Sequence, residues 1–60
     1  MAQYALTNGY NVAAVTKGNK GREFTTTNPE GDVISTVTLF GEDARELERD
    51  LIIANRLASL

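Results

Sequence analysis

The 60-residue chain contains no cysteine, no histidine and no tryptophan. Without cysteine it has neither disulfides nor thiolate metal sites, and without histidine it lacks the commonest general base and metal ligand. The longest apolar run, Leu51–Ala54, is far shorter than the ~20 residues of a membrane span. The start, Met1–Tyr4, does not have the basic region and apolar stretch of a signal peptide. We therefore expect a cytoplasmic protein that binds no membrane.

Positive charge is scarce as well. Six Lys and Arg residues stand against eight Asp and Glu residues, a net charge of -2. The basic residues that do cluster lie around one turn, at Lys17, Lys20 and Arg22, and provide little to neutralise phosphates. We expect no direct binding of nucleic acid.

Catalysis is also unfavourable in a chain of this composition. No histidine is present to activate the Ser and Thr hydroxyls. Paired carboxylates need a cleft that raises one pKa, and a chain this short leaves little room for one. We expect a protein that is not an enzyme and that uses no cofactor and no metal.

The length allows one domain, residues 1–60. A chain of this size buries only about 60% of the surface that its unfolded form exposes, so its core is marginal. Small domains without disulfides or metals often gain stability from a partner chain.

Turn signals divide the first forty residues into short segments; they are Asn8-Gly9, Gly18–Gly21 and Asn28–Gly31. The segments between them are rich in Val, Thr, Tyr and Phe, which is typical of strands: Tyr10–Lys17, Arg22–Thr27 and Asp32–Phe40. We predict an α+β fold in which a three-stranded antiparallel meander is followed by one C-terminal helix. Gln3–Thr7 is a candidate fourth strand, so the sheet covers about residues 3–40.

The apolar period becomes helical after Gly41 and predicts a helix over about residues 43–58. Asp43 and Glu46 have the spacing of a capping box at its start. One stripe should pack on the sheet: Ala44, Leu47, Leu51, Ala54 and Ala58.

A second apolar stripe on this helix consists of Ile53, Leu57 and Leu60. Because the sheet can cover only one stripe, we predict a homodimer with the C-terminal half of the helix in the interface. The alternative is that a folded-back N-terminal segment covers Ile53 and Leu57.

Acidic residues concentrate in residues 30–50, where seven of them stand against Arg45 and Arg49. Glu42, Glu46 and Asp50 lie at i, i+4 and i+8, and so form a row on one helix face. Such a row can occupy a basic groove built for nucleic-acid phosphates. The alternative is an ordinary solvated helix face.

Several short motifs occur in order along the chain: Tyr10-Asn11-Val12, Gly21-Arg22-Glu23-Phe24 and Leu39-Phe40-Gly41, then Ala44 and Glu46-Leu47. In their order and spacing the chain resembles the small uracil-DNA glycosylase inhibitors of short-tailed Bacillus phages. The resemblance runs over most of the chain with sparse identities. It implies a homodimer that mimics DNA, occupies the DNA-binding cleft of host uracil-DNA glycosylase and blocks uracil excision in the host cytoplasm.

The resemblance also implies a site. In the family, a hydrophobic pocket holds the apolar residue that the enzyme inserts into DNA, and acidic groups stand in for phosphates. Phe40 matches the pocket aromatic, with Leu39 behind it; alternatively, Val37 and Phe40 of both copies build the pocket, or both belong to the core. The expected partner-binding residues are Thr36, Val37, Leu39, Phe40, Glu42, Asp43 and Glu46.

The chain departs from the family on the last strand, where Thr36 and Val37 stand in place of an aromatic and an acidic residue. The phosphate-like carboxylates must then come from the helix start or from other acidic positions, namely Glu30, Asp32 and Asp50. Two other functions remain open: an interaction module of the same fold that binds a different host protein, and a purely structural dimer.

Overall fold

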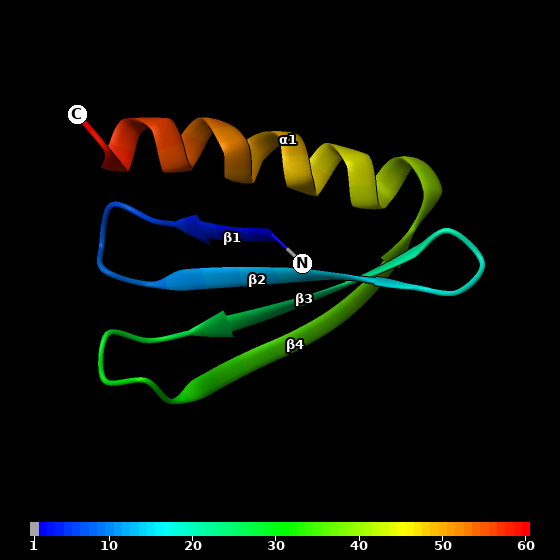
Figure 1. Ribbon diagram of the computed structural model, residues 1–60, viewed down its shortest axis with the longest axis horizontal. Coiled ribbons are helices and arrows are strands. Elements are labelled where there is room, and N and C mark those ends of the chain that lie inside the picture. Colours follow the sequence, from blue (N-terminus) through cyan, green and yellow to red (C-terminus); the bar gives the residue numbers. More distant parts are fainter. Residues whose placement is uncertain (1) are drawn as a thin grey trace.

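The computed structural model describes residues 2–60 (Figure 1). This part of the chain forms four strands and one helix: β1 (Ala2–Ala5), β2 (Asn11–Lys17), β3 (Gly21–Thr27), β4 (Val33–Phe40) and α1 (Gly41–Ala58). The strands pair antiparallel in the order β1-β2-β3-β4. The predicted α+β meander is confirmed, with the fourth strand present.

Strand β1, which corresponds to the candidate fourth strand, is shorter than the predicted segment Gln3–Thr7. It ends at Ala5 rather than at Thr7, because the Leu6 amide donates to the Tyr10 carbonyl (2.8 Å) and the Gly9 amide donates to the Leu6 carbonyl (3.2 Å). These two hydrogen bonds place residues 6–10 in a closed loop instead of a longer strand.

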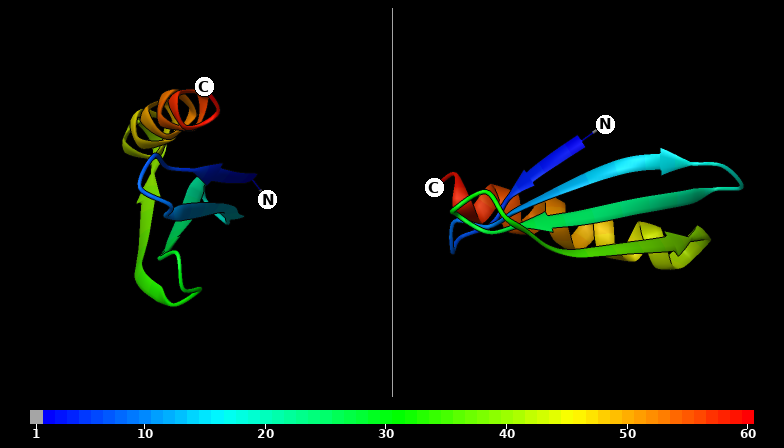
Figure 2. Two further views of the ribbon diagram at one scale, coloured as in Figure 1. Left: turned by 90° about the vertical axis from the view of Figure 1, so that its left-hand side faces the viewer. Right: turned by 90° about the horizontal axis from the view of Figure 1, so that it is seen from below.

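The helix packs on one face of the sheet, and no other described element covers the opposite face (Figure 2). Within residues 2–60 the buried apolar side chains come from both layers: Val12, Ala14, Phe24, Ala44 and Leu51. The predicted helix stripe is confirmed, since Ala44 and Leu51 are buried and the rest of the stripe is half-buried. No helix in this part of the chain is long and apolar enough to cross a bilayer.

The β2–β3 hairpin closes through three residues, Gly18–Lys20. Asn19 and Lys20 have φ angles of 60° and 62°, as in the turn type that matches the twist of paired strands. Gly21 follows, opposite Phe40 on β4. A Cβ atom at Gly21 would lie 2.8 Å from Cε2 of Phe40, so glycine at this position lets the aromatic ring lie against β3.

The helix begins earlier than the sequence pattern indicates. Its N-cap is Phe40, which offers no side-chain cap, and Asp43 lies inside the first turn. The predicted capping box between Asp43 and Glu46 is therefore wrong. The reason is Gly41, whose φ of +56° turns the chain from strand to helix without an intervening loop.

Candidate functional site

An apolar recess of about 220 Å³ opens between α1 and the β4 side of the sheet. Leu47 and Leu51 of the helix form one wall, and the floor comes from the strands: Val12, Phe24, Thr26, Ser35 and Val37. Val37 remains 44% exposed, so the helix does not close this side of the sheet.

The strand register explains which predicted residues reach the recess. Val37 pairs with Phe24, whose ring is buried under the helix, so both side chains face α1. Leu39 has the same parity as Val37 and is half-buried against the core. Thr36 and Phe40 have the opposite parity and point to the uncovered face.

Phe40 lies outside this recess, and its predicted place at a partner-binding pocket stays a prediction. Phe40 pairs with Gly21, is 56% exposed and does not line the recess. The alternative interpretation of Phe40 and Val37 as core residues is wrong, because both are substantially exposed. Of the predicted pocket residues, Val37 is the one that the structure brings to the recess.

The predicted carboxylates fall into two groups, one on α1 and one in the turn before β4. Asp43 and Asp50 lie one helical turn to either side of Leu47 and so flank the recess on the helix side. Glu42 and Glu46 lie further round the same helix, and all four are exposed. Glu30 and Asp32 precede β4, whose eight residues extend about 26 Å at 3.3 Å per residue before the helix begins.

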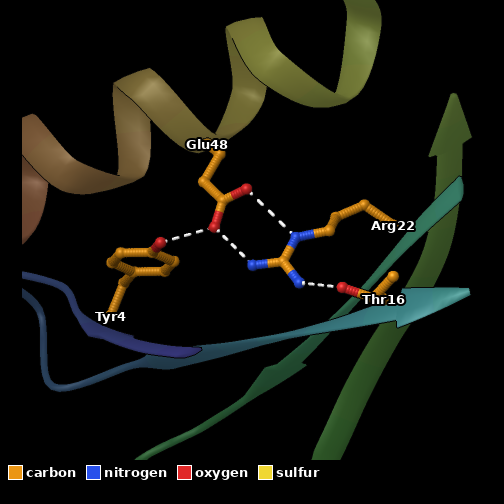
Figure 3. A network of polar contacts seen from close by, with 4 residues as sticks. All are labelled: Tyr4, Thr16, Arg22 and Glu48. Atoms are coloured by element: carbon orange, nitrogen blue, oxygen red, sulfur yellow. Dashed lines mark hydrogen bonds and ion pairs between the residues drawn. The ribbon is translucent and has the colours of Figure 1, made fainter. Parts of the chain in front are cut away.

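A polar network joins the helix to the strands on its β1 side, away from the recess (Figure 3). Nε and Nη2 of Arg22 donate to the two carboxylate oxygens of Glu48 at 3.1 and 2.8 Å. The Tyr4 hydroxyl donates to Glu48 Oε2 at 2.5 Å, and Nη1 of Arg22 donates to Thr16 Oγ1 at 2.8 Å. The network joins β1, β2 and β3 to α1, and the side chains of Arg22 and Glu48 are each 22% exposed.

These contacts shift the titration of all three ionisable groups. The hydrogen bonds from Arg22, and after them from Tyr4, lower the pKa of Glu48. The hydrogen bond to Glu48 raises the pKa of Tyr4 and also that of Arg22. Sequence reasoning missed this cluster, because Glu48 is 44 residues from Tyr4 and 26 from Arg22 and no local pattern links them.

The lowered pKa of Glu48 predicts an acid-sensitive fold. The unfolded chain takes up a proton at this carboxyl at higher pH than the folded chain does, so protonation favours unfolding. The stabilisation is complete above the ordinary glutamate pKa, near 4.3, and is lost as the pH falls through the lowered value. Urea unfolding between pH 7 and pH 3 should therefore show a steeper acid loss of stability in the native protein than in Glu48→Gln. Parallel curves for the two proteins would contradict this prediction.

A second, polar hollow of about 320 Å³ lies beside the start of α1. Its charged lining consists of Lys20, Arg22 and Arg45 against one acidic residue, Glu48. Arg45 also lies 3.6 Å from Glu42 at the surface. The lining of the hollow is therefore more basic than acidic, whereas Glu42 and Asp43 lie in the first turn of α1 at the same end of the sheet.

The residues predicted for the dimer interface are exposed. Ile53 is 50%, Leu57 55% and Leu60 100% exposed, so the alternative in which the N-terminal segment covers Ile53 and Leu57 is wrong. The homodimer itself stays a prediction. Among residues 2–60, no group of three or more acidic side chains is arranged to hold a metal ion.

Comparisons with protein-family models, with curated proteins and with solved structures found no match to this chain. The likeness to the phage inhibitors therefore rests on the motifs alone.

Proposed function

We propose that this protein inhibits uracil-DNA glycosylase by occupying the enzyme's DNA-binding cleft. The observation that carries the proposal is the open apolar recess between α1 and β4, with Asp43 and Asp50 beside it on the helix. An inhibitor of a DNA-binding enzyme needs no reactive group. It needs a surface with negative charge and a hollow for the side chain that the enzyme inserts into DNA.

The recess has a suitable size and lining for this role. Cavities of about 150 Å³ accept a benzene-sized group, so a hollow of about 220 Å³ can take one protruding apolar side chain. Burial of such a side chain contributes about 1.5–3 kcal/mol. Its lining carries no charged group, so an apolar guest leaves no charge buried and unpaired.

The carboxylates supply attraction at longer range. Asp43 and Asp50 are exposed on the helix beside Leu47 of the recess, and Glu46 is exposed further round the same helix. Negative charge of this kind accelerates association with a basic cleft and helps to select the partner, whereas desolvated apolar contacts supply most of the affinity. The same surface would also suit a different host protein with a basic groove and a protruding apolar residue, which is the second candidate function.

The test is inhibition of a bacterial uracil-DNA glycosylase acting on a uracil-containing oligonucleotide. We expect uracil release to stop when the native protein is in excess at micromolar concentration. Thr26→Phe fills the recess from β3 and should weaken inhibition at least 10-fold, because the inserted side chain is excluded. Thr25→Phe is the matched control, since the neighbouring residue points to the uncovered face and should leave inhibition unchanged.

Thermal unfolding followed by circular dichroism must show that both variants fold. Undiminished uracil release with the native protein would reject the glycosylase as the target and favour the second candidate. Equal inhibition by Thr26→Phe and Thr25→Phe would reject the recess as the contact. A tight gel shift with plain duplex DNA would indicate a nucleic-acid-binding protein instead.

A further inference from the structure

The strand β4 is an unprotected edge of the sheet (Figure 1). In residues 2–60 it pairs with β3 alone, and its eight residues include neither charge nor proline. Natural sheets usually protect such an edge with lysine, proline or a very short strand. The opposite edge follows that rule, since β1 has only four residues and its Ala5 amide donates to Asn55 Oδ1 of the helix at 2.8 Å. Of the two edges, β4 is therefore the one that can accept another strand.

The hydrogen bonds between β3 and β4 determine which backbone groups of β4 are turned outward. The Gly41 amide donates to the Lys20 carbonyl at 3.4 Å, one step beyond the last residue pair of this ladder. In an antiparallel pair, positions that exchange hydrogen bonds alternate with positions that do not. Counted back from Gly41, Val37 bonds to β3, whereas the amides and carbonyls of Thr36 and Thr38 point away from it.

These outward groups are in register with the recess. Thr36 and Thr38 flank Val37, whose side chain faces α1 and lines the recess. An added antiparallel strand would bond to both threonines, so its residue opposite Val37 would occupy a non-hydrogen-bonded position. Side chains that face each other at such a position share one face of the sheet, with Cβ atoms about 4.5–5.5 Å apart. The residue opposite Val37 would thus lie at the open side of the recess, toward Leu47.

We propose that β4 binds an extended segment of the partner protein as a fifth, antiparallel strand, with a leucine or another large apolar side chain opposite Val37. The inference rests on the proposed function, because it names the segment with which the partner fills the recess. In this mode of recognition, main-chain hydrogen bonds provide affinity and pockets for alternate side chains provide specificity. The recess, with about 220 Å³ and no charged group in its lining, selects an apolar side chain at one position of the segment.

The edge and the recess together specify an extended occupant. A helix cannot pair with β4, because its amides and carbonyls bond within the helix. A small apolar molecule would fill the recess but would leave the outward groups of Thr36 and Thr38 to water. The segment is also uncharged where it faces β4, since the strand has no charge to pair with.

A peptide as long as β4 tests this inference without any enzyme. The probe has threonine and serine around a central leucine, and a lysine at each end for solubility. Added to isotope-labelled protein at up to millimolar concentration, it should shift the amide NMR signals of Thr36 and Thr38 and slow their hydrogen exchange. The same peptide with a central glycine should bind at least 10-fold more weakly. A peptide with N-methyl groups on the amides that face β4 should not bind.

Variants of the protein separate the edge from the recess. Thr36→Pro removes an outward amide and keeps the ladder to β3, because proline is tolerated on an edge strand where the N–H faces solvent. It should weaken binding of the leucine peptide at least 10-fold, whereas Thr36→Ala keeps the amide and should bind as the native protein does. Thr26→Phe fills the recess and should remove the preference for leucine over glycine. Circular dichroism shows whether each variant folds, and the N-methylated peptide tests the edge in the native protein.

Equal binding of the leucine and N-methylated peptides would overturn the proposal, as would no binding of the leucine peptide. A native protein that sediments as a dimer, with the amides of Thr36 and Thr38 already protected from exchange, would also overturn it, because a second copy would then occupy the edge. Inhibition of the glycosylase that Thr36→Pro leaves unchanged would reject the strand pairing and retain the proposed function. Peptide binding as expected, with undiminished uracil release, would support the strand pairing and reject only the glycosylase as partner.

Discussion

Phe24→Ala is expected to unfold most of the protein at room temperature. Phe24 is 3% exposed and is the largest side chain of the buried cluster between sheet and helix. Removing a buried phenylalanine side chain costs about 3–5 kcal/mol. A 60-residue domain has a total stability of roughly 3–9 kcal/mol, so the loss is comparable with all that is available. Urea unfolding followed by circular dichroism measures the change.

Phe40→Ala is the matched control for this change. Its ring is 56% exposed on the uncovered face, so its truncation should cost less than about 1 kcal/mol. Phe24→Leu keeps much of the buried volume and should lower stability by an intermediate amount while leaving the protein folded. Similar losses in Phe24→Ala and Phe40→Ala would contradict the assignment of these two aromatics to core and surface.

Glu48→Ala is expected to lower the free energy of unfolding by about 1.5–3 kcal/mol, the range for hydrogen bonds to charged groups. The change removes the acceptor of three hydrogen bonds and leaves the largely covered guanidinium of Arg22 without its carboxylate. Arg22→Ala should have a similar effect. In the double variant the two losses should not add, because both remove the same interaction. Urea titrations of the four proteins measure the coupling.

Glu42→Ala provides the comparison for an exposed ion pair. Its carboxylate lies 3.6 Å from Arg45, and both side chains are more than three-quarters exposed. Such pairs contribute between zero and about 1 kcal/mol. If Glu48→Ala lowered the free energy of unfolding no more than Glu42→Ala does, the network of Tyr4, Arg22 and Glu48 would contribute no more to stability than an exposed ion pair. It would then not hold the helix on the sheet.

The position of the network helps to explain why the recess is open on the β4 side of the helix. It lies on the side of α1 that faces β1, where Asn55 makes a further contact with Ala5. The contacts of the helix with β1 are therefore polar and directional. The side toward β4 has apolar walls and no such contact in the described residues, and there the recess stays open.

Local chemistry in the sequence was sufficient for the secondary structure. Turn residues such as Asn19 and Gly21 separate β-rich segments, and the change of apolar period after Gly41 marks the helix. The stripe that includes Ala44 and Leu51 was predictable because helical spacing alone decides which residues share a face. The predicted start of the helix was too late. Asp43 has the side chain of an N-cap residue, but the positive φ of Gly41 lets the helix begin directly after β4.

The sequence by itself therefore determined a meander with a following helix and the helix face that meets it, because these depend on residues close together in the chain. Tertiary structure alone decided the rest. Strand register turned Phe40 away from the helix and left Val37 beside it. Contacts across 26 and 44 residues gathered Glu48 with Arg22 and Tyr4, and no local pattern encodes contacts between segments so distant. Strand order made β4 an edge, since an edge is a property of the assembled sheet.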